Sequence, residues 1–581
     1  MSLDTSRRPD TAEQAASASS SNSTAVPSVE STRTPAAPEA GATGMPVLTH
    51  RQILVVFSGL MLGMFLAALD QTILSTALPT IVNQLHGLNH LSWVLTAYLL
   101  TSTISTPIYG KLSDQFGRKG LFQGAIVIFL VGSILSGLSQ NMFELIMFRG
   151  IQGLGAGGLM ALAMTIIADV VSPRDRGKYQ GYFAATFALS SVAGPLLGGV
   201  FTEHLSWRWI FYINVPIGLV ALVVTSVVLK LPFRRQSHAI DYIGAVLMLV
   251  GVTATLLVMV WGGVQYAWGS PIIIGLSIVA AVFLAAFVVW ERHAKEPSLP
   301  PSLFRLGIFR VSSTVSFLLS MVMFGAVIYL PVYLQLVDGV SPTASGLLLI
   351  PMMLAMLTSS ALSGQVVTRT GIYKPFPIIG SALAALGVFL LSRLDLATPH
   401  WMLSVDVIVL GAGLGMCMQV MVLATQNAVP GAQIGTATAG VVFFRSLGGV
   451  FGAALFGAVF VAGLNHWIPL LVPGASSTSV HVNGSLTQAQ LHSFPPAAQH
   501  GILEAFVRSL HTMFLIGVPV TIAMFVGTLL LKQVRLRTSS ALERTSHEIE
   551  AGAGDPSGAA EDLFESSPDT VGSETAPVDA A

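Results

Sequence analysis

The stretch GKLSDQFGRKG, from Gly110 to Gly120, decides the fold together with a second stretch, SGQVVTRTGIYK, from Ser363 to Lys374. Both are short loops between long apolar runs, and each holds two glycines seven residues apart with basic residues within three positions of the second. The pairs are Gly110 with Gly117, and Gly364 with Gly371. The match indicates an internal repeat. The alternative is a coincidence between two turns of a common type.

Outward from these loops, residues 51–537 divide into apolar runs, each near the roughly 20 residues that a helix needs to cross a bilayer. The fourteen runs lie near 53–78, 92–110, 120–139, 143–166, 179–202, 210–229, 241–261, 271–290, 311–334, 345–366, 375–392, 403–425, 438–463 and 509–531. If the central pair is an insertion, each repeated loop follows the second span of a six-helix half. Transporters with two such parallel halves hold substrate near the membrane midplane, between the halves.

The sequence therefore predicts an all-α integral membrane protein with fourteen spans. We expect an N-terminal six-helix half in 51–230, two inserted helices with inner loops in 231–300, and a C-terminal six-helix half in 301–537. This C-terminal half is expected to include an external loop over 464–508. The loop holds the glycosylation-type triplet Asn483-Gly484-Ser485. If the host is bacterial, that triplet carries little meaning.

Basic residues give the predicted orientation, because Lys and Arg concentrate in cytoplasmic loops. With the N-terminus inside, the inner loops carry most of these residues, whereas the outer loops hold Arg208 and Arg393, with Arg508 at the edge of the last span. Tryptophans favour the membrane interface. Those at the predicted outer surface are Trp93, Trp207, Trp209, Trp261, Trp268, Trp401 and Trp467. We therefore expect a multi-pass protein of the plasma membrane with both termini cytoplasmic.

The two ends of the chain differ from the apolar centre. Residues 1–50 are rich in Ser, Ala, Thr, Pro and Glu and contain no apolar segment of a signal peptide, and residues 538–581 are similar but more acidic. Neither stretch has enough apolar surface to offset the entropy of an ordered chain, so both are predicted to be disordered.

Composition excludes several classes of protein. Only 10% of the residues are charged and 53% are hydrophobic, whereas soluble domains carry about 25% charged residues. The formal net charge of zero argues against a nucleic-acid partner. Cys417 is the single cysteine, which rules out an intrachain disulfide and a cysteine zinc site. GLGAGG (153–158) lacks the Lys-Ser/Thr of a nucleotide loop. We expect no enzyme activity, no cofactor, no metal and no nucleotide, and a monomer is favoured.

Several motifs resemble those of the major facilitator superfamily, in particular its fourteen-span drug:proton antiporter branch. They are LDQTILSTALP (69–79), GKLSDQFGRKG (110–120), RGIQGLGAG (149–157), GPLLGG (194–199) and WRWIFYINVPIG (207–218). The third resembles the fourth-span arginine motif and the fourth the core of the antiporter motif, which usually has a glycine where this chain has Ser190. The resemblance implies proton-driven export of small lipophilic or cationic organic compounds, of the multidrug efflux type.

Asp70 and Arg149 are charges inside predicted spans, where each costs about 2.5–3.5 kcal/mol on insertion scales. Counted at 1.5 Å per residue, both lie at a similar depth in the outer half of the membrane, so they can meet. We expect Asp70 to bind the transported proton and Arg149 to tune it, since burial favours the neutral acid and a guanidinium favours the carboxylate. A static pair that holds two helices together is the alternative.

The loop after the second span is expected to form a cytoplasmic gate. Its residues are Gly110, Asp114, Gly117, Arg118 and Lys119, with Asp169 at the inner end of the fourth span as the natural partner of Arg118. Such a cluster would hold an outward-facing state closed at the cytoplasm, or it is only a positive anchor at the inner surface. In the fifth span, Gly194, Gly198 and Gly199 allow close helix approach, and Pro195 adds a bend.

The substrate cavity is harder to predict. Polar, aromatic and Met residues suit varied organic ligands, although ordinary helix packing explains any one of them equally well. The candidates are Gln71, Gln152, Phe324, Tyr329, Met418, Gln419 and Arg445. Arg445 either contacts an anionic substrate or braces the second half, and bracing is favoured.

Two other functions remain open at this point. One is export of a single endogenous metabolite, lipid or siderophore, which sequence does not separate from multidrug export. The other is a membrane sensor or scaffold without transport, which predicts indifference to Asp70 and no coupling to the proton gradient.

Overall fold

The structure is a computed structural model that describes residues 50–85, 91–229, 241–263, 265–294, 297, 299–472, 491 and 494–536. The predicted disordered ends and the Asn483 triplet lie outside the described residues, as does the stretch 230–240. The described part is helical and contains no β-strand beyond one isolated bridge between Gly262 and Tyr266.

The first block of helices contains the first six predicted spans. It consists of α1 (His50–Leu85), α2 (Leu91–Phe116), α3 (Arg118–Leu138), α4 (Met142–Val170), α5 (Arg176–His204), α6 (Trp209–Tyr212) and α7 (Asn214–Val228). The predicted inserted pair follows as α8 (Tyr242–Trp261) and α9 (Pro271–Glu291).

The second block contains the last six predicted spans. It consists of α10 (Pro301–Arg305), α11 (Gly307–Leu336), α12 (Pro342–Leu348), α13 (Ile350–Thr370), α14 (Pro375–Leu391), α15 (His400–Ala428), the 3-10 turn η2 (Gly431–Gln433), α16 (Ile434–Leu471) and α18 (Pro496–Leu529). The predicted loop over 464–508 was too long at both ends, because α16 continues to Leu471 and α18 already begins at Pro496. Pro at the first turn of α18 suits a helix start, since its missing N–H is not needed there.

Glycine geometry supports the repeat between the two loops. Gly117 connects α2 directly to α3 with a φ of 88°, and Gly371 ends α13 in the left-handed region with a φ of 73°. Residues with a Cβ rarely adopt these angles, so glycine is needed for each turn. The second glycine of each quoted stretch thus makes the turn out of the second long helix of its block.

Eleven helices in the described part are long and apolar enough to cross a membrane. Every predicted run falls on a helix, but α2 and α5 are not among the eleven and α14 is a shorter apolar helix. Thr and Ser on α2, such as Thr101, Ser102 and Thr103, lower its apolar character. Fourteen spans with cytoplasmic termini therefore stay a prediction.

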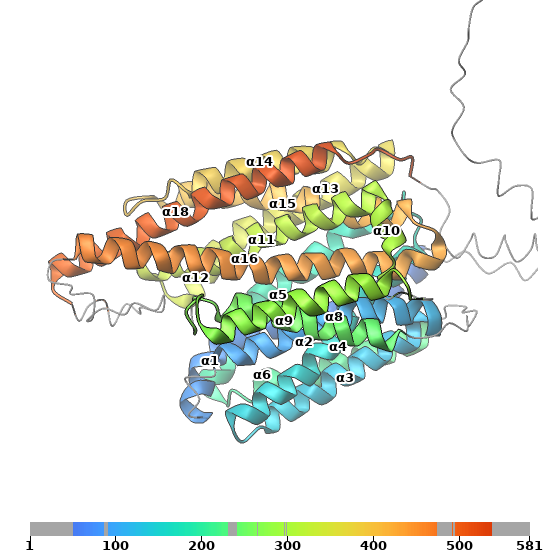
Figure 1. Ribbon diagram of the computed structural model, residues 1–581, viewed down its shortest axis with the longest axis horizontal. Helices are drawn as coiled ribbons and strands as arrows, with labels where there is room; N and C mark the ends of the chain where they lie inside the picture. Colours follow the sequence, from blue (N-terminus) through green and yellow to red (C-terminus); the bar gives the residue numbers. More distant parts are fainter. Residues whose placement is uncertain are drawn as a thin grey trace, which may run out of the picture. The chain divides into compact units, whose positions relative to one another are not determined.

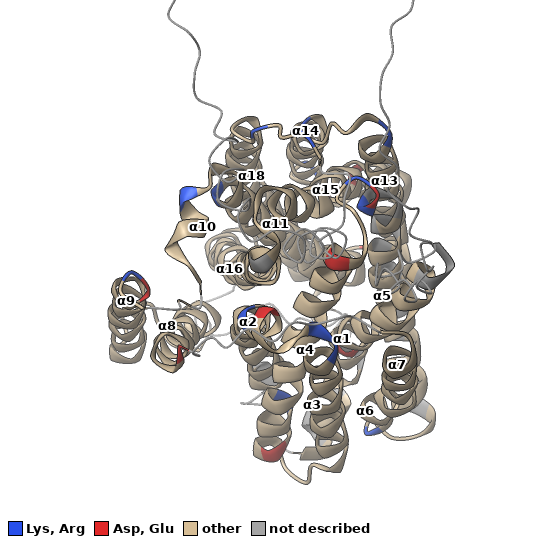
Figure 2. Cartoon of the chain, turned by 90° about the vertical axis from the view of Figure 1, so that its right-hand side faces the viewer, with Lys and Arg blue, Asp and Glu red and all other residues tan. Residues whose placement is uncertain are grey.

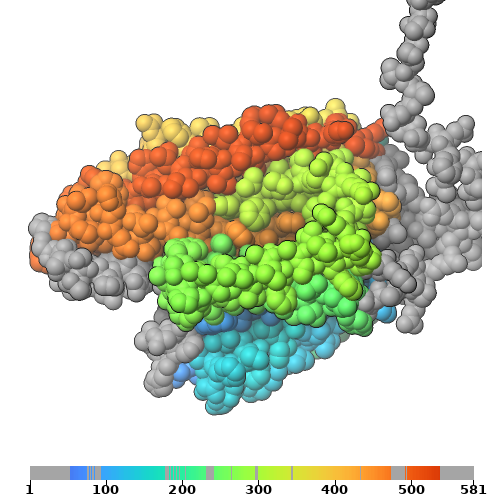
Figure 3. Space-filling view, viewed as in Figure 1, coloured from blue at the N-terminus to red at the C-terminus, as the bar shows by residue number. Residues whose placement is uncertain are grey.

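Several apolar cores hold the helices together. One is built from α11, α13, α14, α15, α16 and α18, a second from α1, α3, α4, α5 and α7 with residues of α15 and α16, and a third from α1, α2, α4 and α6. Figure 1 shows the long helices running side by side, with α8 and α9 paired next to each other. A fourth cluster joins α8 and α9 to α2 and α16, so the pair packs against both blocks. Figure 2, along the helices, places α8 and α9 at one edge beside α2 and α16, and Figure 3 shows the pair (green) on the surface.

Candidate functional site

The first polar cluster joins α1 to α4 and contains Asp70 and Arg149. The Nη1 of Arg149 donates to Oδ2 of Asp70 at 2.5 Å, and the two residues are 0% and 1% exposed, respectively. The contact expected from their depths is therefore present. A buried charge of either sign is costly unless it is paired, and this pair has no net charge.

Neighbouring side chains hold the pair in place. Gln152, one turn after Arg149 on α4, donates from Nε2 to the second carboxylate oxygen of Asp70 at 2.8 Å and accepts from Arg149 Nη1 at 2.8 Å. The Tyr98 ring lies 4.2 Å from the guanidinium carbon, a cation–π distance, and its hydroxyl donates to Ala67 O of α1 at 3.2 Å. Gln71 lies beside the Tyr98 hydroxyl. Sequence reasoning missed Tyr98, because nothing in the α2 pattern distinguishes it from a core aromatic residue.

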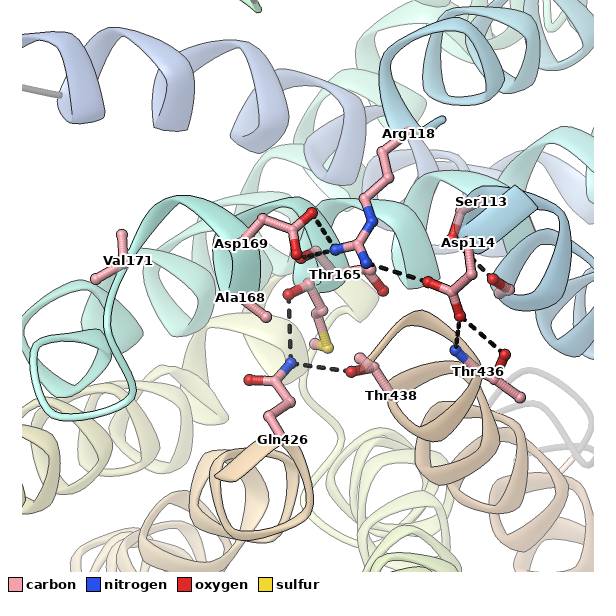
Figure 4. Close-up of polar contacts among 12 residues, drawn as sticks. Ser113, Asp114, Arg118, Thr165, Ala168, Asp169, Val171, Gln426, Thr436 and Thr438 are labelled. Atoms are coloured by element: carbon pink, nitrogen blue, oxygen red, sulfur yellow. Dashed lines mark hydrogen bonds and ion pairs between the residues drawn. The ribbon is translucent and has the colours of Figure 1, made fainter. Parts of the chain in front are cut away.

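The second polar cluster lies at the inner end, the name used here for the end of the helices that is predicted to face the cytoplasm. Arg118 donates to Asp114 at 3.1 Å, to the carbonyl of Thr165 at 3.0 Å, and forms an ion pair with Asp169. Figure 4 shows Arg118 between the two acids. Gly117 supplies the turn that brings Arg118 back over α4.

Asp114 also reaches the second block. Its Oδ2 accepts from the backbone N–H and the hydroxyl of Thr436, both at 2.9 Å. Thr436 lies in the first turn of α16, where unpaired N–H groups favour an acid. Gly110 packs on Ala439 and Gly435 so closely that a Cβ would overlap them. The predicted gate thus contains a joint between the two blocks (Figure 4).

A second joint at the inner end was missed from the sequence. Arg176, at the start of α5, donates to Gln426 of α15 at 2.8 Å and to the carbonyls of Val171 and Ala168. The Gln426 amide donates in turn to Met164 O of α4 and Thr438 of α16, at 3.4 and 3.1 Å. Arg176 looked only like one more basic residue of an inner loop, and no pattern marks Gln426.

Lys119 points away from both joints. Its Nζ donates at 2.8 Å to the carbonyl of Ser226, at the end of α7, so it ties the gate loop to the first block alone. This contact differs from the predicted place of Lys119 in the gate. The reason is the turn at Gly117, after which Arg118 and Lys119 leave α3 in different directions.

The GPLLGG stretch lies on α5 where that helix packs against α1. Gly194 sits against Thr72, whose hydroxyl donates to the carbonyl of Ser190 at 2.8 Å. A side chain on Gly194 would overlap Thr72, whereas Gly199 has open space around it. Gly198 is buried, and the side chain of Pro195 lies outside the described residues. One glycine of the predicted motif is therefore required for close helix approach, and another is not.

The predicted cavity residues fall into separate groups. Gln71 and Gln152 lie with the Asp70 cluster, while Phe324 packs against Gly449 and Tyr329 stacks on Phe460, both of α16. Met418 and Gln419 line a small cavity between α5, α13 and α15. Arg445 is buried on α16 and has no hydrogen bond or ion pair among the described residues.

Comparison with known proteins gives one family and one fold. Residues 60–453 match the family model described as Major Facilitator Superfamily. An uncharacterized MFS-type transporter of Mycobacterium tuberculosis is 43% identical over 86% of this chain and 72% of its own length. The multidrug transporter protein MdtP of Bacillus subtilis is 38% identical over 86% of this chain and 96% of its own. The proton:xylose symporter XylE matches in structure with a TM-score of 0.56, 17% identity, and coverage of 85% and 99%.

Proposed function

The chain belongs to the major facilitator superfamily, whose members are multi-pass membrane transporters, and we propose that this one is a proton-coupled exporter of small lipophilic or cationic organic compounds. The observation that carries the proposal is the buried Asp70–Arg149–Gln152 cluster. An ionisable acid inside a membrane helix lowers the stability of that helix in the bilayer, so it is by default a candidate for a functional role. The named multidrug relative supports the substrate class.

In the proposed mechanism, Asp70 carries the proton. While Arg149 and Gln152 contact the Asp70 carboxylate, they favour its charged form. A shift of α4 relative to α1 that withdraws them leaves a buried carboxylate, and burial favours the neutral acid. Helix movement thus loads or releases one proton. The proposed driving force is the proton gradient across the membrane. Its electrical part contributes about 2.3 kcal/mol per charge per 100 mV of membrane potential.

Alternating access in this proposal uses the two joints at the inner end. Asp114–Thr436 and Arg176–Gln426 connect the two blocks, and both must open before the inner end can admit substrate. Each joint has its charged group on the first block and a neutral partner on the second. Arg118 and Asp169 both belong to the first block, so they stay paired with one another when the blocks separate. The opening movement therefore leaves no ion pair broken at this cluster.

Efflux of ethidium, a fluorescent lipophilic cation, from cells that express the protein tests the proposal. We expect efflux to stop on addition of a protonophore and to be lost in Asp70→Asn at unchanged expression. Glu504→Gln is the matched control, because it removes a carboxylate from a partly exposed pair with Arg508 and should leave efflux intact. Normal efflux by Asp70→Asn would contradict proton coupling at this site.

The same experiment separates the other candidate functions. Absence of ethidium efflux, together with proton uptake on addition of one endogenous compound, would indicate a dedicated exporter. Absence of any gradient-dependent flux, with Asp70→Asn indistinguishable from the parent chain, would indicate a sensor or scaffold.

A further inference from the structure

Arg445 is a charge in the interior of the second block that the described side chains leave uncompensated. It is 9% exposed, its Nη1 is buried without a partner, and the structure gives it no hydrogen bond or ion pair among the described residues. The other buried arginine of the helix interior, Arg149, has a carboxylate, an amide and an aromatic ring around it. A guanidinium in an apolar interior is costly without an anion.

Among the described residues, the buried acid of the neighbouring helix α15 is too far away to supply that anion. Asp406 is the buried acid of α15 and lies twenty positions before Gln426. Gln426 contacts Thr438, and Arg445 lies seven positions after Thr438 on the antiparallel α16. At 1.5 Å per residue, Asp406 is therefore about 30 Å and Arg445 about 10 Å along the helices from that contact. The two charges lie about 20 Å apart.

The same contact shows which residue of α15 lies at the level of Arg445. Seven residues make nearly two full turns, so a residue seven positions away leaves a helix on nearly the same face. Gln419 precedes Gln426 by seven, and Arg445 follows Thr438 by seven. Because Gln426 and Thr438 are hydrogen-bonded at 3.1 Å, Gln419 and Arg445 lie at the same level, two turns further along their helices.

Hydroxyl groups from α11 approach the same level. The backbones of Phe317 and Met321 pack against Gly448 and Gly452 of α16, on the face that also carries Arg445. One turn before Phe317, Ser313 is 4% exposed and its hydroxyl has no hydrogen-bond partner. Gln419 is 6% exposed and lines a small cavity. That cavity is bounded by Phe187, Met356, Ser360, Gly415, Met418 and Gln419.

We propose that Arg445, together with Gln419 and Ser313, binds the carboxylate of an organic anion. The inference rests on the proposed export function and adds organic anions to its substrate class. A guanidinium fork and an amide N–H both donate, and a carboxylate accepts two parallel hydrogen bonds from such groups.

Binding of fluorescein, an aromatic carboxylate, to the purified full-length protein in nanodiscs of zwitterionic lipid tests the site. Fluorescence polarisation should give a dissociation constant at least tenfold lower for fluorescein than for its methyl ester, which keeps the ring system but lacks the carboxylate. We expect Arg445→Gln to abolish this difference while ethidium binding changes less than twofold. Arg445→Lys, which keeps the charge but loses the fork, should retain part of the preference.

Controls separate the site from general effects. Arg310→Gln removes an exposed arginine near the start of α11 and should leave fluorescein binding unchanged. Equal binding of fluorescein and its ester by the parent chain would overturn the proposal without any variant, so poor folding of Arg445→Gln does not leave it open. Loss of fluorescein and ethidium binding together would show that Arg445 only braces the helices.

Two further arms define the source of the anion and the relation to export. Nanodiscs that contain anionic lipid should leave fluorescein binding within twofold. Strong competition by that lipid would overturn the assignment in favour of a lipid headgroup. Because Asp70 takes no part in the anion site, Asp70→Asn should still bind fluorescein. If Asp70→Asn loses efflux but the parent chain shows no preference for fluorescein over its ester, the anion site is refuted and the proposed proton-coupled export is not.

Discussion

At the scale of single residues, the decisive contact is the one between Asp70 and Gln152. Gln152 holds one oxygen of the carboxylate, and Arg149 holds the other. We predict that Gln152→Leu lowers thermal stability, because it leaves charged groups with a missing partner, and hydrogen bonds to charged groups are worth about 1.5–3 kcal/mol. Thermal unfolding of the purified protein in detergent measures the loss.

A double-mutant cycle shows whether the effect passes through this contact. Asp70→Asn combined with Gln152→Leu should destabilise less than the sum of the single variants, since both remove one interaction. Strictly additive shifts in the unfolding midpoint would mean that Gln152 acts independently of Asp70.

At the scale of helix pairs, the approach of α1 to α5 depends on one glycine. A methyl group at Gly194 would overlap Thr72, whereas the same group at Gly199 meets open space. We predict that Gly194→Ala costs about 1–3 kcal/mol, the usual range for overpacking, and reduces ethidium efflux. Gly199→Ala should lie within about 0.5 kcal/mol of the parent chain, as surface substitutions do. Unfolding midpoints and efflux rates of the two variants, compared side by side, check this, and equal effects would contradict it.

At the scale of the whole molecule, the joints at the inner end set which state is populated. We predict that Asp169→Arg, which places a second cation beside Arg118 and draws Asp114 away from Thr436, opens the inner end, and that adding Arg118→Asp restores closure. Thr438→Cys reports the state, because Thr438 is buried between the blocks and the single native cysteine, Cys417, is buried as well. Labelling by a water-soluble maleimide should be at least tenfold faster in Asp169→Arg.

The double variant distinguishes a latch from a positive anchor. If the cluster only anchors the loop at the inner surface, labelling of Thr438→Cys should respond to neither substitution, and charge reversal should not rescue anything. The parent chain with Thr438→Cys alone provides the baseline, since all three proteins lack the Thr438 hydroxyl that Gln426 contacts.

The sequence by itself determined the all-helical character, the family and the pairing of Asp70 with Arg149. Each follows from local quantities: runs of apolar residues, motif spacing, and the depth of a rare charge along its helix. The paired loops around Gly117 and Gly371 were readable for the same reason, since a left-handed turn requires glycine. The extended ends of α16 and α18 were not, because polar residues hide a helix that continues beyond its apolar part.

Only the tertiary structure decided the contacts between the blocks. Thr436 and Gln426 became partners of Asp114 and Arg176, Lys119 turned toward α7, and Arg445 has no hydrogen bond or ion pair among the described residues. These outcomes depend on the rotation and register of helices that are far apart in the chain. A sliding apolar window carries no information about either, because all faces of these helices are largely apolar.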